Sequence, residues 1–124
     1  MKEKIPVGSD HAGYELKQHI LEDLRALGYE PEDLGTRNTE SVDYPDFARA
    51  VAEKVASGEA KRGVVICGTG IGVSISANKV HGIRAAVATN TYMAEMARRH
   101  NNANILALGG RVLTPDIART VLEA

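Results

Sequence analysis

The chain has 124 residues, of which 44% are hydrophobic and 25% are charged. This composition is typical of one globular domain with its own core and excludes a disordered chain. A formal net charge of −1 gives no electrostatic reason to bind nucleic acid or an acidic membrane, and a single cysteine excludes an internal disulfide. No apolar run approaches the roughly twenty residues of a membrane span, and the N-terminus lacks the pattern of a signal peptide. We therefore expect a single-domain cytoplasmic protein.

The first part of the chain predicts two strands around one helix. Lys4 to Gly8 is a short apolar strand, and apolar residues at helical spacing then predict a helix from Ala12 to Gly28, where glycine suits a helix end. Tyr29 to Leu34 is a weaker strand, because Pro31 confines it to a sheet edge or to a strand start.

The middle of the chain contains a polar loop, two helices and the most apolar strand. Gly35 to Asp43 is rich in turn-forming residues and leads through Tyr44-Pro45 into a helix predicted over Asp46 to Ala56. Gly63 to Cys67 is an apolar strand rich in β-branched residues, and a helix from Ile71 to Lys79 follows almost at once.

The last third continues this alternation. Ile83 to Ala88 and Asn104 to Leu108 are apolar strands, separated by a helix from Thr91 to about His100. Thr114-Pro115-Asp116 then starts a final helix, with a capping hydroxyl, a proline in the first turn and an acid near the positive helix end. Solidly apolar strands that alternate with helices predict an α/β protein: a single-domain, Rossmann-like, parallel five-stranded sheet with helices on both faces.

The strand that ends at Cys67 runs into the glycine-rich loop 68–70 and then into a helix. The N–H groups of a helix start and the positive end of its dipole form an anion site, and glycines let the backbone approach the anion closely. The same helix end should favour the thiolate form of Cys67, so we expect chemistry here as well as binding. In the alternative interpretation, Cys67 is a small buried hydrophobic residue.

Ligands of parallel α/β folds bind where the strands end, and three loops with reactive residues are expected to meet there. These loops are Asp10-His11, the Cys67 loop and the end of the helix at His100-Asn101. His11 and His100 each have a structural alternative. Asp10 and His11 can cap the first helix, and His100 can be a helix C-terminal residue favoured by the dipole.

A nucleotide-binding role for the glycine loop is not supported. Gly68, Gly70 and Gly72 are followed by Val73 where a dinucleotide fingerprint has its third glycine. That fingerprint also needs an acid roughly 20 residues on, whereas residues 61–94 contain neither Asp nor Glu. The histidines and the cysteine show no metal-ligand spacing. The loop suits a small phosphorylated or anionic ligand better.

Six motifs, in order along the chain, resemble those of one enzyme family. They are Ser9-Asp10-His11-Ala12-Gly13, Asp43-Tyr44-Pro45, Ile66-Cys67-Gly68-Thr69-Gly70-Ile71-Gly72, Ala77-Asn78-Lys79, Gly82-Ile83-Arg84-Ala85 and His100-Asn101-Asn102-Ala103-Asn104. As a set they resemble ribose-5-phosphate isomerase type B, a family that includes the galactose-6-phosphate isomerase subunits of the lactose pathway. The resemblance covers essentially the whole chain.

This resemblance implies an aldose–ketose isomerase that interconverts ribose 5-phosphate and ribulose 5-phosphate through an enediolate, without metal or cofactor. Matching positions imply that Cys67 is the base that moves a proton between C2 and C1, and that His100, with Thr69 nearby, assists opening of the sugar ring. The backbone of residues 68–72 would hold the enediolate oxygen. The residues implied to bind substrate are Asp10, His11, Tyr44, Gly68, Gly70, Ile71, Gly72, Asn101 and Arg111, the last at the phosphate group.

The resemblance also implies a homodimer or tetramer with active sites at the subunit interface. Family members run on in a helical segment whose arginines bind the sugar phosphate, so we expect residues 1–124 to be a single isomerase domain that lacks this C-terminal helical extension. Three alternatives remain: isomerisation of a six-carbon sugar phosphate such as galactose or allose 6-phosphate, isomerisation of an unphosphorylated sugar, and a non-catalytic sugar-phosphate-binding subunit.

Overall fold

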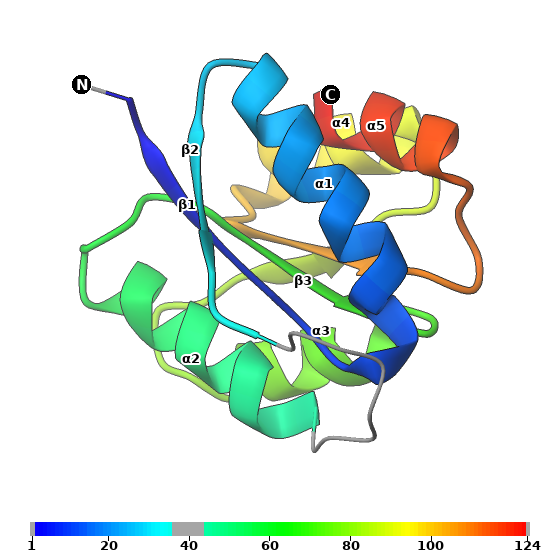
Figure 1. The fold of residues 1–124 in the computed structure, drawn as a ribbon. Coiled ribbons are helices and arrows are strands. Elements are labelled where there is room, and N and C mark those ends of the chain that lie inside the picture. The colour runs from blue at the N-terminus through cyan, green and yellow to red at the C-terminus, as the bar shows by residue number, and fades with distance from the viewer. Residues whose placement is uncertain (1, 36–43, 124) are drawn as a thin grey trace.

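A computed structural model of the chain describes residues 2–35 and 44–123, except for the side chains of residues 44–46. Strands and helices alternate along it (Figure 1). The strands are β1 (Lys4–Ser9), β2 (Glu30–Asp33), β3 (Gly63–Cys67), β4 (Ala85–Val87) and β5 (Ile105–Gly109). The helices are the 3₁₀ turn η1 (His11–Gly13), α1 (Tyr14–Ala26), α2 (Tyr44–Ala56), α3 (Ile71–Asn78), α4 (Thr91–Asn101) and α5 (Pro115–Glu123).

The five strands form one parallel sheet in the order β2-β1-β3-β5-β4. Helices α1, α4 and α5 lie on one face, and α2 and α3 lie on the other (Figure 1). Alternate residues of β3 supply both layers: Val64 and Ile66 pack under α1, whereas Val65 and Cys67 pack under α2 and α3. The predicted fold class is therefore confirmed, and β2 with Pro31 lies at a sheet edge, as predicted.

Several boundaries differ from the sequence prediction by one or more residues, and two of these differences have a clear cause. The first helix starts later than Ala12, because Asp10 accepts a hydrogen bond from the Gly13 N–H at 3.0 Å and caps a separate 3₁₀ turn. The fourth strand is shorter than Ile83 to Ala88, because Ile83 belongs to a turn in which its N–H donates to the Val80 carbonyl at 3.2 Å. The predicted loop from Gly35 to Asp43 lies outside the described residues, apart from Gly35 itself.

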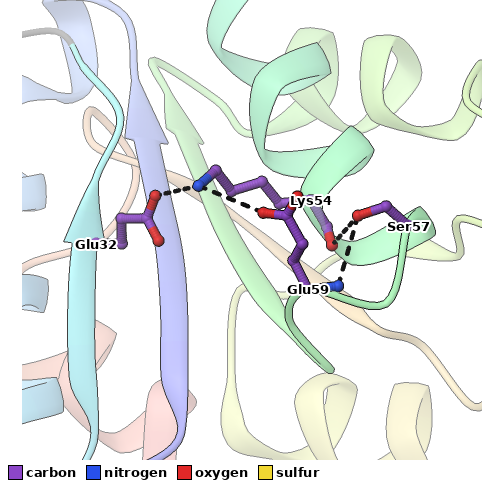
Figure 2. A network of polar contacts seen from close by, with 4 residues as sticks. All are labelled: Glu32, Lys54, Ser57 and Glu59. Carbon is purple, nitrogen blue, oxygen red and sulfur yellow. Dashed lines mark hydrogen bonds and ion pairs between the residues drawn. The ribbon is translucent and has the colours of Figure 1, made fainter.

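Polar contacts tie the end of α2 to the edge strand β2 (Figure 2). The Lys54 ammonium pairs with the Glu32 carboxylate and lies 3.7 Å from Glu59 Oε2, and the hydrogen bond to Glu32 raises the pKa of Lys54. The Ser57 hydroxyl donates to the Lys54 carbonyl at 3.1 Å and accepts from the Glu59 N–H at 3.4 Å. These contacts hold the C-terminal end of α2 in place.

A second network joins the segments that lead into three strands. The Arg62 guanidinium donates to both carboxylate oxygens of Glu3, at 3.0 and 3.2 Å, and to the Tyr29 hydroxyl at 3.1 Å. Such a bidentate pair is geometrically specific. The hydrogen bond from Arg62 lowers the pKa of Glu3 below its ordinary value. This network closes the edge of the sheet at which the strands begin.

The depressed pKa of Glu3 predicts how Glu3→Gln changes stability with pH. A carboxylate whose pKa is lowered by folding contributes stability above its unfolded pKa and loses it as the pH falls through the folded pKa. Glu3→Gln should therefore reduce the free energy of unfolding by about 1 kcal/mol at neutral pH. In urea denaturation of both proteins, this difference should shrink as the pH is lowered from the ordinary range of a glutamate carboxyl through the lowered pKa of Glu3. A difference that stays constant across this range would contradict the assignment.

Candidate active site

The thiol of Cys67 lies at the end of β3, directly before the loop that leads into α3. Cys67 is a free cysteine with only 7% of its surface exposed. Its sulfur accepts a hydrogen bond from the Gly70 N–H at 3.2 Å. Gly70 adopts φ 87°, a left-handed conformation that glycine takes without strain, and this turn folds the loop back over the sulfur. The thiol is therefore held between the strand end and the helix start.

Backbone donors at the start of α3 surround this loop. The first hydrogen bond of the helix runs from the Ser74 N–H to the Gly70 carbonyl, so the N–H groups of Gly72 and Val73 have no acceptor within the helix. The Ile71 N–H instead donates to the exposed Thr69 hydroxyl at 3.2 Å. With the positive end of the helix dipole, these donors can stabilise a negatively charged oxygen next to the thiol.

The loop after β5 packs closely on the Cys67 loop. The Gly110 N–H donates to the Cys67 carbonyl at 2.7 Å, and the Arg111 N–H donates to the Gly68 carbonyl at 2.9 Å. A Cβ at Gly109 would lie 2.6 Å from the Thr69 carbonyl oxygen, so only glycine fits there. The Arg111 side chain runs alongside Gly68, with its Cδ 3.4 Å from the place of a Cβ on that glycine. A cation therefore stands beside the glycine loop.

The loop after β1 completes the same edge of the sheet. Asp10 is nearly buried, and its N–H donates to the Ile66 carbonyl at 3.2 Å. Within the described part of the chain, His11 Nδ1 and Ser9 Oγ are buried without a hydrogen-bond partner. Buried polar atoms are usually paired, so unpaired ones at a loop cluster mark a place where a ligand or water can bind. Asp10 also caps a 3₁₀ turn, η1, rather than the first helix named in its structural alternative.

Tyr44 is the first residue of α2, and its side chain lies outside the described residues. Phe47, one turn further on, packs on Gly8 of β1: a Cβ at Gly8 would lie 3.1 Å from the Phe47 Cβ. Helix α2 therefore starts near the end of β1, at the same edge of the sheet as the Cys67 loop.

The expectation that the His100-Asn101 turn joins these loops within one chain is wrong. Helix α4 leaves the carboxyl edge, where the strands end, and runs back to the amino edge, where they begin (Figure 1). The turn that follows α4 is fixed there, because the Asn104 carbonyl accepts from the N–H of Gly63, the first residue of β3, at 3.0 Å. The four residue steps of β3 separate the two edges by about 13 Å. His100 and Asn101 therefore lie far from Cys67 of their own chain.

Three further residues at the carboxyl edge received no role from the sequence. Ser9 is fully buried with an unpaired hydroxyl, and Gly109 and Gly110 bring the β5 loop against Thr69 and Ala12. A pair of glycines directly after an apolar strand was the available signal, since it indicates close backbone approach.

No group of three or more His, Cys, Asp and Glu side chains in residues 2–35 and 44–123 is arranged to hold a metal ion. None of the helices in these ranges is long and apolar enough to cross a membrane.

Comparison with known proteins identifies relatives that match nearly the whole chain. The family described as Ribose/Galactose Isomerase matches residues 5–124. The chain is 46% identical to ribose-5-phosphate isomerase B of Escherichia coli, over 98% of this chain and 81% of that protein. It is 44% identical to galactose-6-phosphate isomerase subunit LacB of Clostridium acetobutylicum, over 96% of this chain and 69% of the relative. The structure of Clostridium thermocellum ribose-5-phosphate isomerase B superposes with a TM-score of 0.95 at 62% identity, covering 97% and 81% of the two chains. The chain therefore belongs to the ribose/galactose isomerase family.

Proposed function

We propose that this protein is an aldose–ketose isomerase that interconverts ribose 5-phosphate and ribulose 5-phosphate, with Cys67 as its base. The observation that carries this proposal is the position of the Cys67 thiol beside the unpaired N–H groups at the start of α3. A proton-transfer reaction through an enediolate needs both a base and donors aimed at the developing negative oxygen. The relatives named ribose-5-phosphate isomerase B support the choice of substrate.

The reaction starts on the open-chain aldose. The Cys67 thiolate removes the proton on C2, the electron pair of that bond forms the C1–C2 double bond, and the C1 carbonyl oxygen becomes negatively charged. The backbone of residues 68–72 stabilises this oxygen, and the Gly72 N–H is a free donor for it. The thiol then returns the proton to C1, using the electron pair of the C1–C2 double bond. The C2 hydroxyl proton passes to the oxygen on C1, so that C2 becomes the ketone, C1 carries a hydroxyl and the thiolate is restored.

Phosphate and hydroxyl groups are held by the neighbouring loops. Arg111 supplies a positive charge for the phosphate, next to Gly68. His11, with its buried Nδ1, and the buried Asp10 follow β1 at the same edge of the sheet and bind the phosphate or the sugar hydroxyls. Tyr44, the first residue of α2, is kept as a substrate contact because the family motif Asp43-Tyr44-Pro45 implies it.

The remaining groups come from a second copy of the chain. His100 and Asn101 lie at the amino edge, so the partner subunit must supply the histidine that assists ring opening, next to Thr69, and the asparagine that binds substrate. Exposed apolar side chains support a dimer surface around the edge strand β4: Ile71 and Ile75 on α3, and Tyr92 and Met93 on α4. A two-fold axis across this surface, perpendicular to the strands, turns the partner's amino edge toward this chain's carboxyl edge. The 11 residues of α4 extend about 16 Å, so this helix spans the sheet from its carboxyl edge to its amino edge within one chain.

A six-carbon sugar phosphate is the second candidate substrate. The 44% identical relative named galactose-6-phosphate isomerase subunit LacB favours it. A panel of ribose 5-phosphate, galactose 6-phosphate, allose 6-phosphate and unphosphorylated ribose separates these candidates from each other.

The enzyme acts in the cytoplasm, because the charge of sugar phosphates retains them inside cells.

Cys67→Ala should abolish most ketose formation from ribose 5-phosphate. Loss of a general base lowers kcat by about 10²–10⁴-fold, while KM should change little because the phosphate contacts remain. Ketose production is measured for the wild type and for Cys67→Ala, with circular dichroism as a check of folding. A folded Cys67→Ala enzyme with wild-type kcat would show that the base is another group.

The shared site predicts complementation between two inactive proteins. When Cys67→Ala and His100→Ala chains are co-expressed with different tags, the purified heterodimer contains one site with an intact thiol and an intact partner histidine. This heterodimer should recover about half of wild-type kcat, although each homodimer is nearly inactive. Heterodimers as inactive as both parents would place Cys67 and His100 in the same chain's site and contradict the proposal.

A further inference from the structure

We infer that Arg84 is a positioning residue, which acts through the His100-Asn101 turn on the active site of the partner subunit. This inference rests on the proposed function, in which that turn reaches the partner's thiol. Arg84 is exposed, directly precedes β4 and lies at the amino edge. Its guanidinium Nη1 donates to the Asn101 carbonyl at 3.0 Å. It therefore contacts the backbone at the residue that follows His100.

The backbone of Arg84 holds the other end of the same turn. The Arg84 N–H donates to Asn104 Oδ1 at 2.9 Å, and the Arg84 carbonyl accepts from the Asn104 N–H at 3.0 Å. Asn104 Nδ2 in turn donates to the Gly82 carbonyl at 3.1 Å. The segment 101–104 is thus clamped at both ends by one residue, through its side chain at Asn101 and its backbone at Asn104.

The physical reason for a cation at this place is the end of α4. The last carbonyl groups of a helix receive no hydrogen bond from an N–H of the same helix. They also carry the negative end of the helix dipole, so a guanidinium stabilises them. Asn102 then ends the helix in the left-handed conformation with φ 49°, which asparagine tolerates, and its N–H donates to the Ala97 carbonyl. Among the described residues, Arg84 makes no ion pair with a carboxylate. Its charge is directed at the turn.

Loss of this contact should affect catalysis more than folding. The Arg84 side chain is exposed, and its one described hydrogen bond goes to a surface turn, so the core does not depend on it. A shift of about 1 Å in a catalytic group can lower the rate about 10²-fold. Arg84→Met should therefore lower kcat by about 10–100-fold, and Arg84→Lys should restore part of it because the charge remains.

The experiment uses heterodimers with a single competent thiol and compares two arrangements. In the first, an Arg84→Met chain pairs with a Cys67→Ala chain, so the remaining thiol faces a turn with intact Arg84. In the second, one chain carries both substitutions and pairs with a wild-type chain, so the remaining thiol faces the altered turn. The kcat of the first arrangement should equal that of a heterodimer of Cys67→Ala and wild-type chains. The kcat of the second arrangement should be about 10–100-fold lower. Equal kcat in the two arrangements, or the reverse order, overturns the inference, because a folding defect of the altered chain has no such asymmetry.

Two controls separate this inference from the proposed function. Arg99→Met removes another exposed arginine of α4, which pairs with Glu95 at 3.0 Å, and should leave both arrangements equal and unimpaired. Replacing Arg84→Met by His100→Ala in the same two arrangements tests the shared site itself. If His100→Ala shows the asymmetry and Arg84→Met does not, Arg84 has no positioning role and the proposed function stands. If His100→Ala gives equal kcat in the two arrangements, the shared site is wrong. The proposed role of Arg84 is then wrong as well, because it depends on that site.

Discussion

All strands of this sheet run in one direction, so each helix must carry the chain back from the carboxyl edge to the amino edge. Loops that follow strands therefore collect at one edge, and turns that follow helices collect at the other. Cys67 ends a strand and Asp10 and Arg111 follow strands, whereas His100 and Asn101 end a helix. One copy of the fold cannot bring both groups together, and an antiparallel pair of copies can. The composite site that we propose follows from this direction of the chain.

Close backbone contact assembles the part of the site that one chain does contain. Glycine at position 109 lets the β5 loop approach the Thr69 carbonyl to a distance that no side chain permits. The Gly110 and Arg111 N–H groups then bond to the carbonyls of Cys67 and Gly68, which fixes the loop around the sulfur. The Gly72 and Val73 N–H groups at the start of α3 have no acceptor within the helix, and the Arg111 side chain lies beside Gly68 of the same loop. The donors are thus oriented before a substrate arrives, as charge stabilisation in a transition state requires.

Much of this arrangement could be predicted from the sequence. The bounds of β3 agree with the prediction, because five consecutive buried residues leave an apolar run between polar neighbours. The loop after Cys67 was recognisable because glycine spacing reports backbone conformation directly. The position of His100 could not be predicted. The sequence placed it correctly at the end of a helix, but the edge of the sheet at which that helix ends depends on the whole topology. Arg84 was part of a recognised motif but received no role from the sequence, since its contact with Asn101 joins segments that only the fold brings together.

The distance between position 100 and Cys67 tests the composite site most directly. Cys67 is the only cysteine of the chain, so His100→Cys adds a single second thiol, and a short bis-thiosulfonate reagent joins two thiols only when they are close. Our account predicts that His100→Cys is converted to covalently linked dimers on a non-reducing gel. The wild type and Glu22→Cys, an exposed position on α1, should remain monomeric on the same gel. A cross-link formed within one chain, or none at all in His100→Cys, would contradict the account.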